Sequence, residues 1–218
     1  MQFNFLALYE ALPALLVGAL ATLRITALSI AVGLVIGLGA GLARVWPNSF
    51  LRSISSAYIE LIRGTPLLVQ IFLVYFGLPA LGLNLDPFVA GVLAMGINSG
   101  AYVGEIVRGG IESIAQGQME AALSLGMSWW QSMYYIVLPQ ALFRILPSLG
   151  NEFIALLKDS SLVSTIAIAE LTRTGQIIIT RTFKSFEIWM GVALFYFVMT
   201  YAISRIVRYS EKRMRYSE

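Results

Sequence analysis

Long apolar stretches separated by short polar segments make up most of the chain. They cover about residues 12–43, 55–81, 86–110, 142–168 and 186–207. Each stretch reaches the length of roughly 20 residues that a helix needs to cross the hydrocarbon core of a bilayer. The pattern therefore predicts an all-α polytopic membrane protein with about five transmembrane helices, and we expect residues 1–218 to form one domain.

The first apolar stretch carries a repeat of glycines. Gly33, Gly37 and Gly41 recur every four residues and so lie on nearly one face of a helix. Small residues at this spacing allow a neighbouring helix to approach closely, and we expect such a contact here. Arg24 interrupts the same stretch. We expect it to have a structural role rather than to contact a solute.

The second and third stretches carry polar residues at informative places. Gly64 and Pro66 weaken the second helix near its start, after Glu60 and Arg63, which are spaced to neutralise each other. Asp86 followed by Pro87 is typical of a capped start for the third helix. Asn98, Tyr102 and Glu105 then share one face of that helix, with Ser99 beside them. Asn98 and Ser99 therefore serve either interhelical hydrogen bonds or a substrate cavity.

The fourth stretch contains Glu152, Lys158, Asp159 and Ser160, which are costly in contact with lipid and should face protein or water. Lys158 could pair with Glu152 or with a substrate carboxylate. Asp159 could pair with Arg24 or with a substrate amine. These polar residues therefore form either a buried structural charge network or part of a substrate pathway. The candidate pathway residues are Asn98, Ser99, Glu152, Lys158, Asp159 and Ser160.

A polar segment over about residues 112–139 separates the third and fourth stretches. Its residues Glu120 to Ala122 favour a helix that Gly126 breaks. Ser128 and Gln131 have the spacing of a capping box, which predicts a second short helix. Pro139 then predicts another turn of the chain. We therefore expect a helix, a kink and a helix between two membrane spans.

Composition narrows the functional classes. Of the 218 residues, 58% are hydrophobic and only 12% are charged, and the net charge is +3. His and Cys are absent, which excludes Ser–His and Cys–His catalysis, and we expect no transition-metal site. The sequence also lacks the G-x-x-x-x-G-K-[ST] phosphate-binding loop, so we expect no ATP hydrolysis by this chain. The prediction is a non-enzymatic membrane protein without a cofactor of its own.

Charge also predicts the topology. The tail carries Arg205, Arg208, Lys212, Arg213 and Arg215, a cluster that suits a cytoplasmic anchor at anionic lipid better than a nucleic-acid arm. A cytoplasmic C-terminus and five spans place the N-terminus outside, and we interpret the start of the chain as a short lead into the first span. The basic segment 170–187 then lies outside, against the usual rule.

Several spaced motifs resemble a known family. The coupling residues Glu120, Ala121, Ala122, Gly126, Ile136, Leu138 and Pro139 resemble the cytoplasmic EAA loop of ABC-importer permeases. Residues 60–66, and residues 146–152 with 158–160, resemble the polar amino-acid branch of that family, whose members are of the histidine, glutamine and arginine type. The resemblance covers roughly residues 10–215.

This resemblance implies a type I ABC-importer fold in a bacterial plasma membrane and a permease subunit for polar amino acids. It implies three kinds of protein partner: cytoplasmic ATPase subunits that use ATP, an extracytoplasmic amino-acid-binding protein, and a second permease subunit, identical or different. Closure of the ATPases would push on the loop from Glu120 to Pro139.

Two other classes of function compete with this interpretation. A secondary ion-coupled carrier would use Lys158 and Asp159 within the membrane, but it leaves the Glu120 loop unexplained. An intramembrane enzyme would need a nucleophile and a base, and this sequence lacks the residues of the common nucleophile–base pairs. The sequence leaves basic, acidic and amide amino acids all open as substrates.

Overall fold

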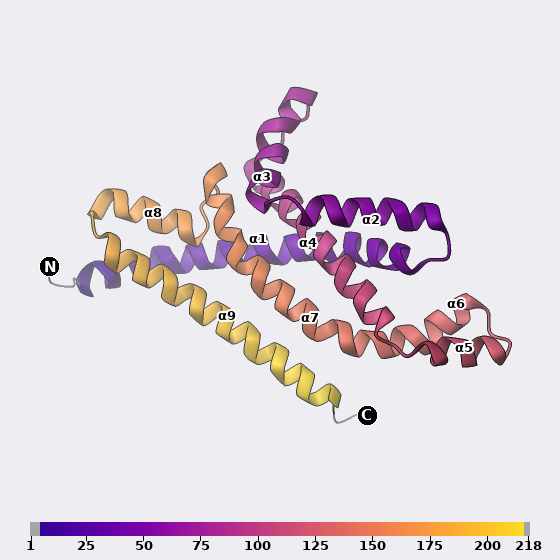
Figure 1. Cartoon of the computed structure of the whole chain (residues 1–218). Helices are drawn as coiled ribbons and strands as arrows, with labels where there is room; N and C mark the ends of the chain where they lie inside the picture. Colours follow the sequence, from indigo (N-terminus) through magenta and orange to yellow (C-terminus); the bar gives the residue numbers. More distant parts are fainter. Residues whose placement is uncertain (1–4, 216–218) are drawn as a thin grey trace.

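The computed structural model describes the backbone of residues 5–215 and the side chains of most of them. The first four residues of the predicted N-terminal lead lie outside the described residues, as do residues 216–218 and the side chains of Arg213 and Arg215 in the predicted basic tail. Helices and turns without strands form the described part (Figure 1), which confirms the all-α prediction.

Two long helices form the centre of the molecule, α1 (Phe5–Val45) and α4 (Pro87–Glu112). They pack closely through the predicted glycine face. A Cβ added at Gly37 would lie 2.5 Å from the Val103 side chain, and one at Gly41 would lie 2.6 Å from that of Val107. The helix backbones thus approach at distances that only glycine permits.

The second apolar stretch is not one helix, contrary to the prediction of a span over residues 55–81. The helix α2 (Ser49–Arg63) is followed by a bend of 102° and then by the short helices α3 (Leu67–Phe72), η1 (Leu73–Gly77) and η2 (Leu78–Leu81). Pro66 has no backbone N–H to continue the helix. The side-chain amide of Gln70 instead donates to the carbonyls of Ile62 and Thr65, at 2.8 and 3.1 Å, and so holds the bend.

The fourth stretch is also divided. The helix α7 (Leu138–Asp159) ends inside the predicted span 142–168, and the tighter helix η4 (Ser160–Ile166) follows it. The chain then continues through α8 (Leu171–Thr182) into α9 (Ser185–Arg215). The change of helix type falls directly after the polar residues Lys158 and Asp159.

Three helices of the described chain are long and apolar enough to cross a membrane, namely α1, α4 and residues 185–209 of α9. The bent pair of α2 with α3 to η2 makes up to four. The helix α7, which contains Arg144 and Glu152, is not among them. Of its charged residues, Arg144, Lys158 and Asp159 are exposed and Glu152 is half-buried, and a membrane span in this part of the chain stays a prediction from the sequence.

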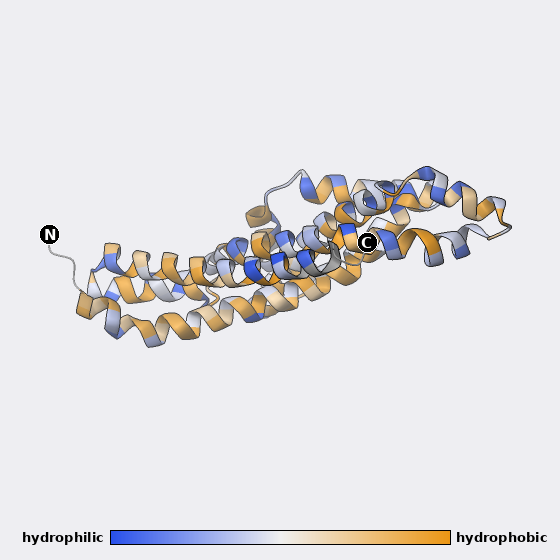
Figure 2. Cartoon of the chain, turned by 90° about the horizontal axis from the view of Figure 1, so that it is seen from below, coloured by the Kyte–Doolittle hydropathy of each residue, from blue (hydrophilic) through white to orange (hydrophobic). Residues whose placement is uncertain are grey.

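The outward surfaces are apolar. Figure 2 shows apolar residues along the length of the long helices. On α9, Leu194, Phe197 and Val198 are all more than half exposed. A face of this kind is stable in contact with lipid and not with water. The polar groups that remain inside the bundle are therefore the candidates for function.

Candidate functional site

A polar cleft lies where the bend after α2 meets α4 and the end of α7. Its volume is about 630 Å³. The bend, α4 and the segment from α7 into η4 each contribute to its wall, which consists of Arg63, Gly64, Thr65, Pro66, Leu67, Asn98, Tyr102, Glu152, Ala155, Asp159 and Leu162. Polar residues of three segments thus converge on one hollow between membrane-length helices.

Hydrogen bonds fix the polar wall of this cleft. The amide nitrogen of Asn98 donates to the Oε1 atom of Gln70 at 3.0 Å, and this ties α4 to the bend. The hydroxyl of Ser99 donates to the Oε1 atom of Glu152 at 2.8 Å, which ties α4 to α7. Asn98 and Glu152 are therefore held in place before any solute enters the cleft.

The structure brings together only part of the predicted pathway set. Asn98, Glu152 and Asp159 line the cleft, and Ser99 lies buried behind Glu152. Lys158 is exposed and is not part of the cleft wall. Ser160 is buried and donates to the carbonyl of Leu157 at 2.7 Å instead.

The charge pairs considered from the sequence are not formed. The described side chains make no ion pair between Asp159 and Arg24, or between Lys158 and Glu152. The guanidinium of Arg24 lies over the ring of Phe88, 5.1 Å from its centre, which agrees with the structural role expected for it. Lys158 and Asp159 point in different directions because adjacent helical residues are separated by about 100°.

The one cation among the described residues of the cleft wall is Arg63, and the sequence did not predict it there. Arg63 was expected to face Glu60, but its guanidinium lies 5.2 Å from the ring centre of Tyr102 and 3.9 Å from Glu105. Glu60 approaches Arg44 instead, at 3.9 Å. The shared face of Asn98 and Tyr102 was a usable signal, but the 102° bend that brings Arg63 to this face was not visible in the sequence.

A second polar cluster lies away from the cleft and was also missed. Glu170 is fully buried and precedes α8. Its carboxylate accepts hydrogen bonds from the backbone N–H groups of Thr172 and Arg173, at 2.9 and 2.7 Å, and from the hydroxyls of Tyr196 and Thr22, at 3.0 and 3.4 Å. Glu170 therefore caps α8 and joins it to α1 and α9.

The predicted coupling segment projects from one end of the bundle, beside the loop between α1 and α2 (Figure 1). It contains α5 (Gln116–Ser124) and α6 (Trp129–Ser132). Gly126 has a φ of +83°, as a chain reversal after α5 requires. Ser128 and Gln131 form the predicted capping box. The helix, the kink and the second helical start are thus confirmed.

The turn expected at Pro139 is wrong. The second helix runs from α6 through the wider π-helix η3 (Met133–Val137) directly into α7. Pro139 provides no N–H for the preceding turn, and the side-chain amide of Gln140 donates to the carbonyl of Ile136 at 2.8 Å. The widened turn accommodates the proline, so α6, η3 and α7 form one continuous rod.

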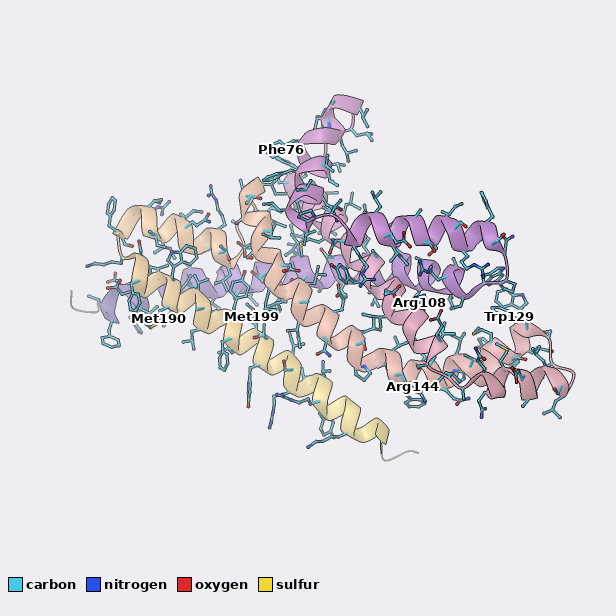
Figure 3. All side chains as sticks on the ribbon, in the orientation of Figure 1. Phe76, Arg108, Trp129, Arg144, Met190 and Met199 are labelled. Carbon is cyan, nitrogen blue, oxygen red and sulfur yellow. The ribbon has the colours of Figure 1, made fainter. Side chains whose placement is uncertain are left out.

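The expected coupling residues differ in their exposure. Glu120, Ala121, Gly126 and Pro139 are exposed, whereas Ala122 is buried and Ile136 and Leu138 are half-buried. Arg144 of α7 donates a hydrogen bond to the carbonyl of Ser113 and so holds the start of the segment against α7 (Figure 3). The segment thus presents one free face while its other face is anchored.

Three tryptophans connect the coupling segment to the loop after α1. The ring of Trp46 lies 4.1 Å from that of Trp130 and 5.4 Å from that of Trp129, between ring centres. Figure 3 shows Trp129 at this end of the molecule. A second cavity of about 660 Å³ lies beside these rings and is bordered by Arg44 and Glu112. The segment is therefore attached to both α1 and α7.

Comparison with known proteins gives consistent matches. The family described as "Binding-protein-dependent transport system inner membrane component" matches residues 29–216. The glutamine transport system permease protein GlnP of Escherichia coli K12 is 48% identical over 217 residues, which is 99% of each chain. The probable glutamine ABC transporter permease protein GlnM of Bacillus subtilis is 40% identical over 196 residues, covering 90% of this chain and 91% of the relative.

Solved structures agree with these matches. A chain of an amino acid ABC transporter crystallised with histidines superposes with a TM-score of 0.93 at 45% identity, covering 98% of this chain and 100% of the other. A chain of the methionine ABC transporter MetNI in an inward-facing conformation gives a TM-score of 0.73 at 22% identity, covering 89% and 95%. The second match supports the fold alone.

Proposed function

The chain belongs to the family of binding-protein-dependent transport system inner membrane components, and from this premise we propose that it is the permease subunit of an ATP-driven importer of amino acids. The observation that carries the proposal is the cleft, where one guanidinium and two carboxylates lie between membrane-length helices. A zwitterionic amino acid carries an ammonium and a carboxylate group, so its binding site needs both negative and positive side chains. The permeases named for glutamine make glutamine the first candidate substrate.

We assign the cleft residues complementary roles. Asp159 and Glu152 accept the ammonium group of the amino acid, and Asn98 offers its amide to a polar side chain. Ser99 acts indirectly by orienting Glu152. Lys158 and Ser160 lie outside the cleft wall, and their contribution to the pathway stays a prediction from the sequence.

A partner subunit, rather than this chain, would bind and hydrolyse ATP. The exposed residues Glu120, Ala121 and Gly126 form the free face of the coupling segment, and cytoplasmic ATPase subunits would dock there. The helix α5, which carries Glu120 and Ala121, packs against α6 and η3, and these continue directly into α7. A push on this face would therefore move the helix that carries Glu152 and Asp159. The rod thus connects ATP-driven motion to the cleft by rigid-body movement.

The remaining assignments follow from the family and the charges. A second permease subunit, identical or different, would complete the pathway, and an extracytoplasmic binding protein would deliver the amino acid. We place the N-terminus outside and the C-terminus in the cytoplasm of a bacterial cell. The single domain over residues 1–218 remains our proposal. The carrier alternative receives no support, because the matched relatives are permease subunits of ABC transporters.

Reconstitution tests the proposal. The chain is co-expressed with its ATPase, inserted into proteoliposomes and supplied with the binding protein and radiolabelled glutamine. Uptake should require ATP and persist when ion gradients are collapsed. Uptake driven by an ion gradient without ATP would instead establish the carrier function.

A further inference from the structure

A ladder of charged side chains runs along one face of α4. Glu105, Arg108 and Glu112 follow one another at intervals of three and four residues. Arg108 donates hydrogen bonds to Glu105 and to Glu112, and Arg63 of the neighbouring helix α2 lies beside Glu105. Figure 3 shows Arg108 on this helix. Charges in a membrane-length helix are stable when they face protein or water rather than lipid.

Glu105 holds its two cationic neighbours unequally. Arg108 donates two hydrogen bonds to the Glu105 carboxylate, of which the Nε–Oε2 contact measures 3.1 Å. The Arg63 guanidinium stays 3.9 Å from Glu105, beyond hydrogen-bond distance, and lies instead over the Tyr102 ring. Arg63 is thus the loosely held member of the ladder.

Arg63 is also the member that faces the cleft. It lines the wall together with Tyr102, Glu152 and Asp159. A planar guanidinium matches a carboxylate with two parallel hydrogen bonds, a better contact than the present one with Glu105. A carboxylate that enters the cleft therefore competes directly with Glu105 for Arg63.

We propose that Glu105 is the resident counter-ion of Arg63 and that the carboxylate of the transported amino acid displaces it. This inference rests on the proposed function. The exchange leaves no charge unpaired, because Glu105 keeps its two hydrogen bonds to Arg108. When the amino acid leaves, Glu105 is still beside Arg63 and pairs with it again. Tyr102 keeps the guanidinium at the cleft in both states.

Direct binding to the purified permease–ATPase complex in nanodiscs tests this role. The probes are glutamine and its decarboxylated analogue, 4-aminobutanamide. Glu105→Gln removes the competing charge and should tighten glutamine binding by about 2- to 5-fold, the range for a partly exposed ion pair. The affinity for the analogue should stay unchanged, since it has no carboxylate to compete with Glu105.

A matched control and a second variant complete the test. Glu60→Gln removes a carboxylate from an ion pair of the same 3.9 Å length outside the cleft, and it should leave glutamine binding unchanged. Arg63→Gln should abolish the advantage of glutamine over the analogue and the effect of Glu105→Gln. Because the Arg63 side chain is 40% exposed, this variant tests the idea even if Glu105→Gln fails to fold.

The outcomes separate the two proposals. Absence of glutamine binding to the wild-type complex, together with absence of ATP-dependent uptake in proteoliposomes, would contradict the proposed function with glutamine as its substrate. Wild-type glutamine binding that Glu105→Gln leaves unchanged, or equal shifts for glutamine and the analogue, would overturn only the counter-ion role.

Discussion

Glu170 shows at the scale of one residue how a buried charge can be structural. Its four hydrogen-bond donors come from three helices or their starts, and its side chain is fully buried. A carboxylate in this setting stabilises the bundle because every donor around it is satisfied. Its removal leaves those donors without a partner.

We therefore predict that Glu170→Ala lowers the free energy of unfolding by about 2–4 kcal/mol, through the lost cap and the unpaired donors. The melting temperature of the purified protein in detergent measures the effect. The control is Glu60→Ala, at a side chain that is 77% exposed, which should change the melting temperature little. Equal melting temperatures for the two variants would contradict this structural role.

Asp159 and Lys158 are adjacent and differ in their surroundings. Asp159 lines the cleft and makes no ion pair among the described residues, so its neutralisation strands no partner. Asp159→Asn should keep the folded yield and reduce transport by about tenfold or more, the value of a hydrogen bond to a charged group. Lys158→Gln changes a side chain outside the cleft wall and should reduce transport less than Asp159→Asn does. A low yield of Asp159→Asn, or equal transport defects in both variants, would count against the assignment.

At the scale of elements, local sequence signals predicted helix starts well. Asp86 caps α4 and Ser128 caps α6 because each cap needs only partners within three residues. Glu170 also accepts two backbone N–H groups, but its partners in α1 and α9 are more than 20 residues away. Contacts of that range could not be derived from one sequence.

Proline gave mixed results as a signal for the ends of helices. The sequence predicted a turn at Pro139, whereas the π-helix η3 keeps the rod intact. The π-helix η1 likewise precedes Leu78 and Pro79. By contrast, Pro66 does stand at a break, where the side chain of Gln70 caps the exposed carbonyls. Whether a proline ends a helix thus depends on neighbouring groups that can replace the lost hydrogen bond.

The contact between α1 and α4 is testable with two neighbouring glycines. Gly37→Ala places a methyl group 2.5 Å from Val103 and should destabilise the protein by about 1–3 kcal/mol. Gly39→Ala meets no atom within 4 Å and should be neutral or stabilising by up to about 1 kcal/mol. Melting temperatures of the two variants provide the comparison, and equal values would refute the close packing.

The coupling segment offers a similar pair. Gly126→Leu forces a side chain into a conformation at φ +83° that costs about 1–2 kcal/mol, which should misshape the free face and weaken co-purification of the ATPase. Gly82→Leu imposes the same strain at φ +81°, away from the coupling segment, and should retain the ATPase. Glu120→Lys should also weaken co-purification without loss of the inserted protein. Wild-type ATPase recovery with Gly126→Leu or Glu120→Lys would contradict the docking face.

At the scale of the whole molecule, one rod from α6 to Asp159 joins the coupling segment to the cleft. The sequence predicted the membrane class, the coupling segment and part of the cleft. It could not place Arg63 in the cleft, because the bend of 102° follows from tertiary contacts of Gln70 as well as from Pro66. Most of the predicted charge pairs failed for the same reason, because Glu60, Arg63 and Arg24 contact residues of other helices. Lys158 and Asp159 make no ion pair among the described residues.

The most direct test of the central claim asks whether the cleft is the translocation pathway. The chain has no cysteine, so Ala155→Cys introduces a single thiol into the cleft wall. In proteoliposomes, modification by a charged methanethiosulfonate reagent should abolish most ATP-driven glutamine uptake, and glutamine should slow the modification. Lys212→Cys, at an exposed position on α9, should react without loss of uptake. Full uptake after complete modification of Ala155→Cys would contradict the account.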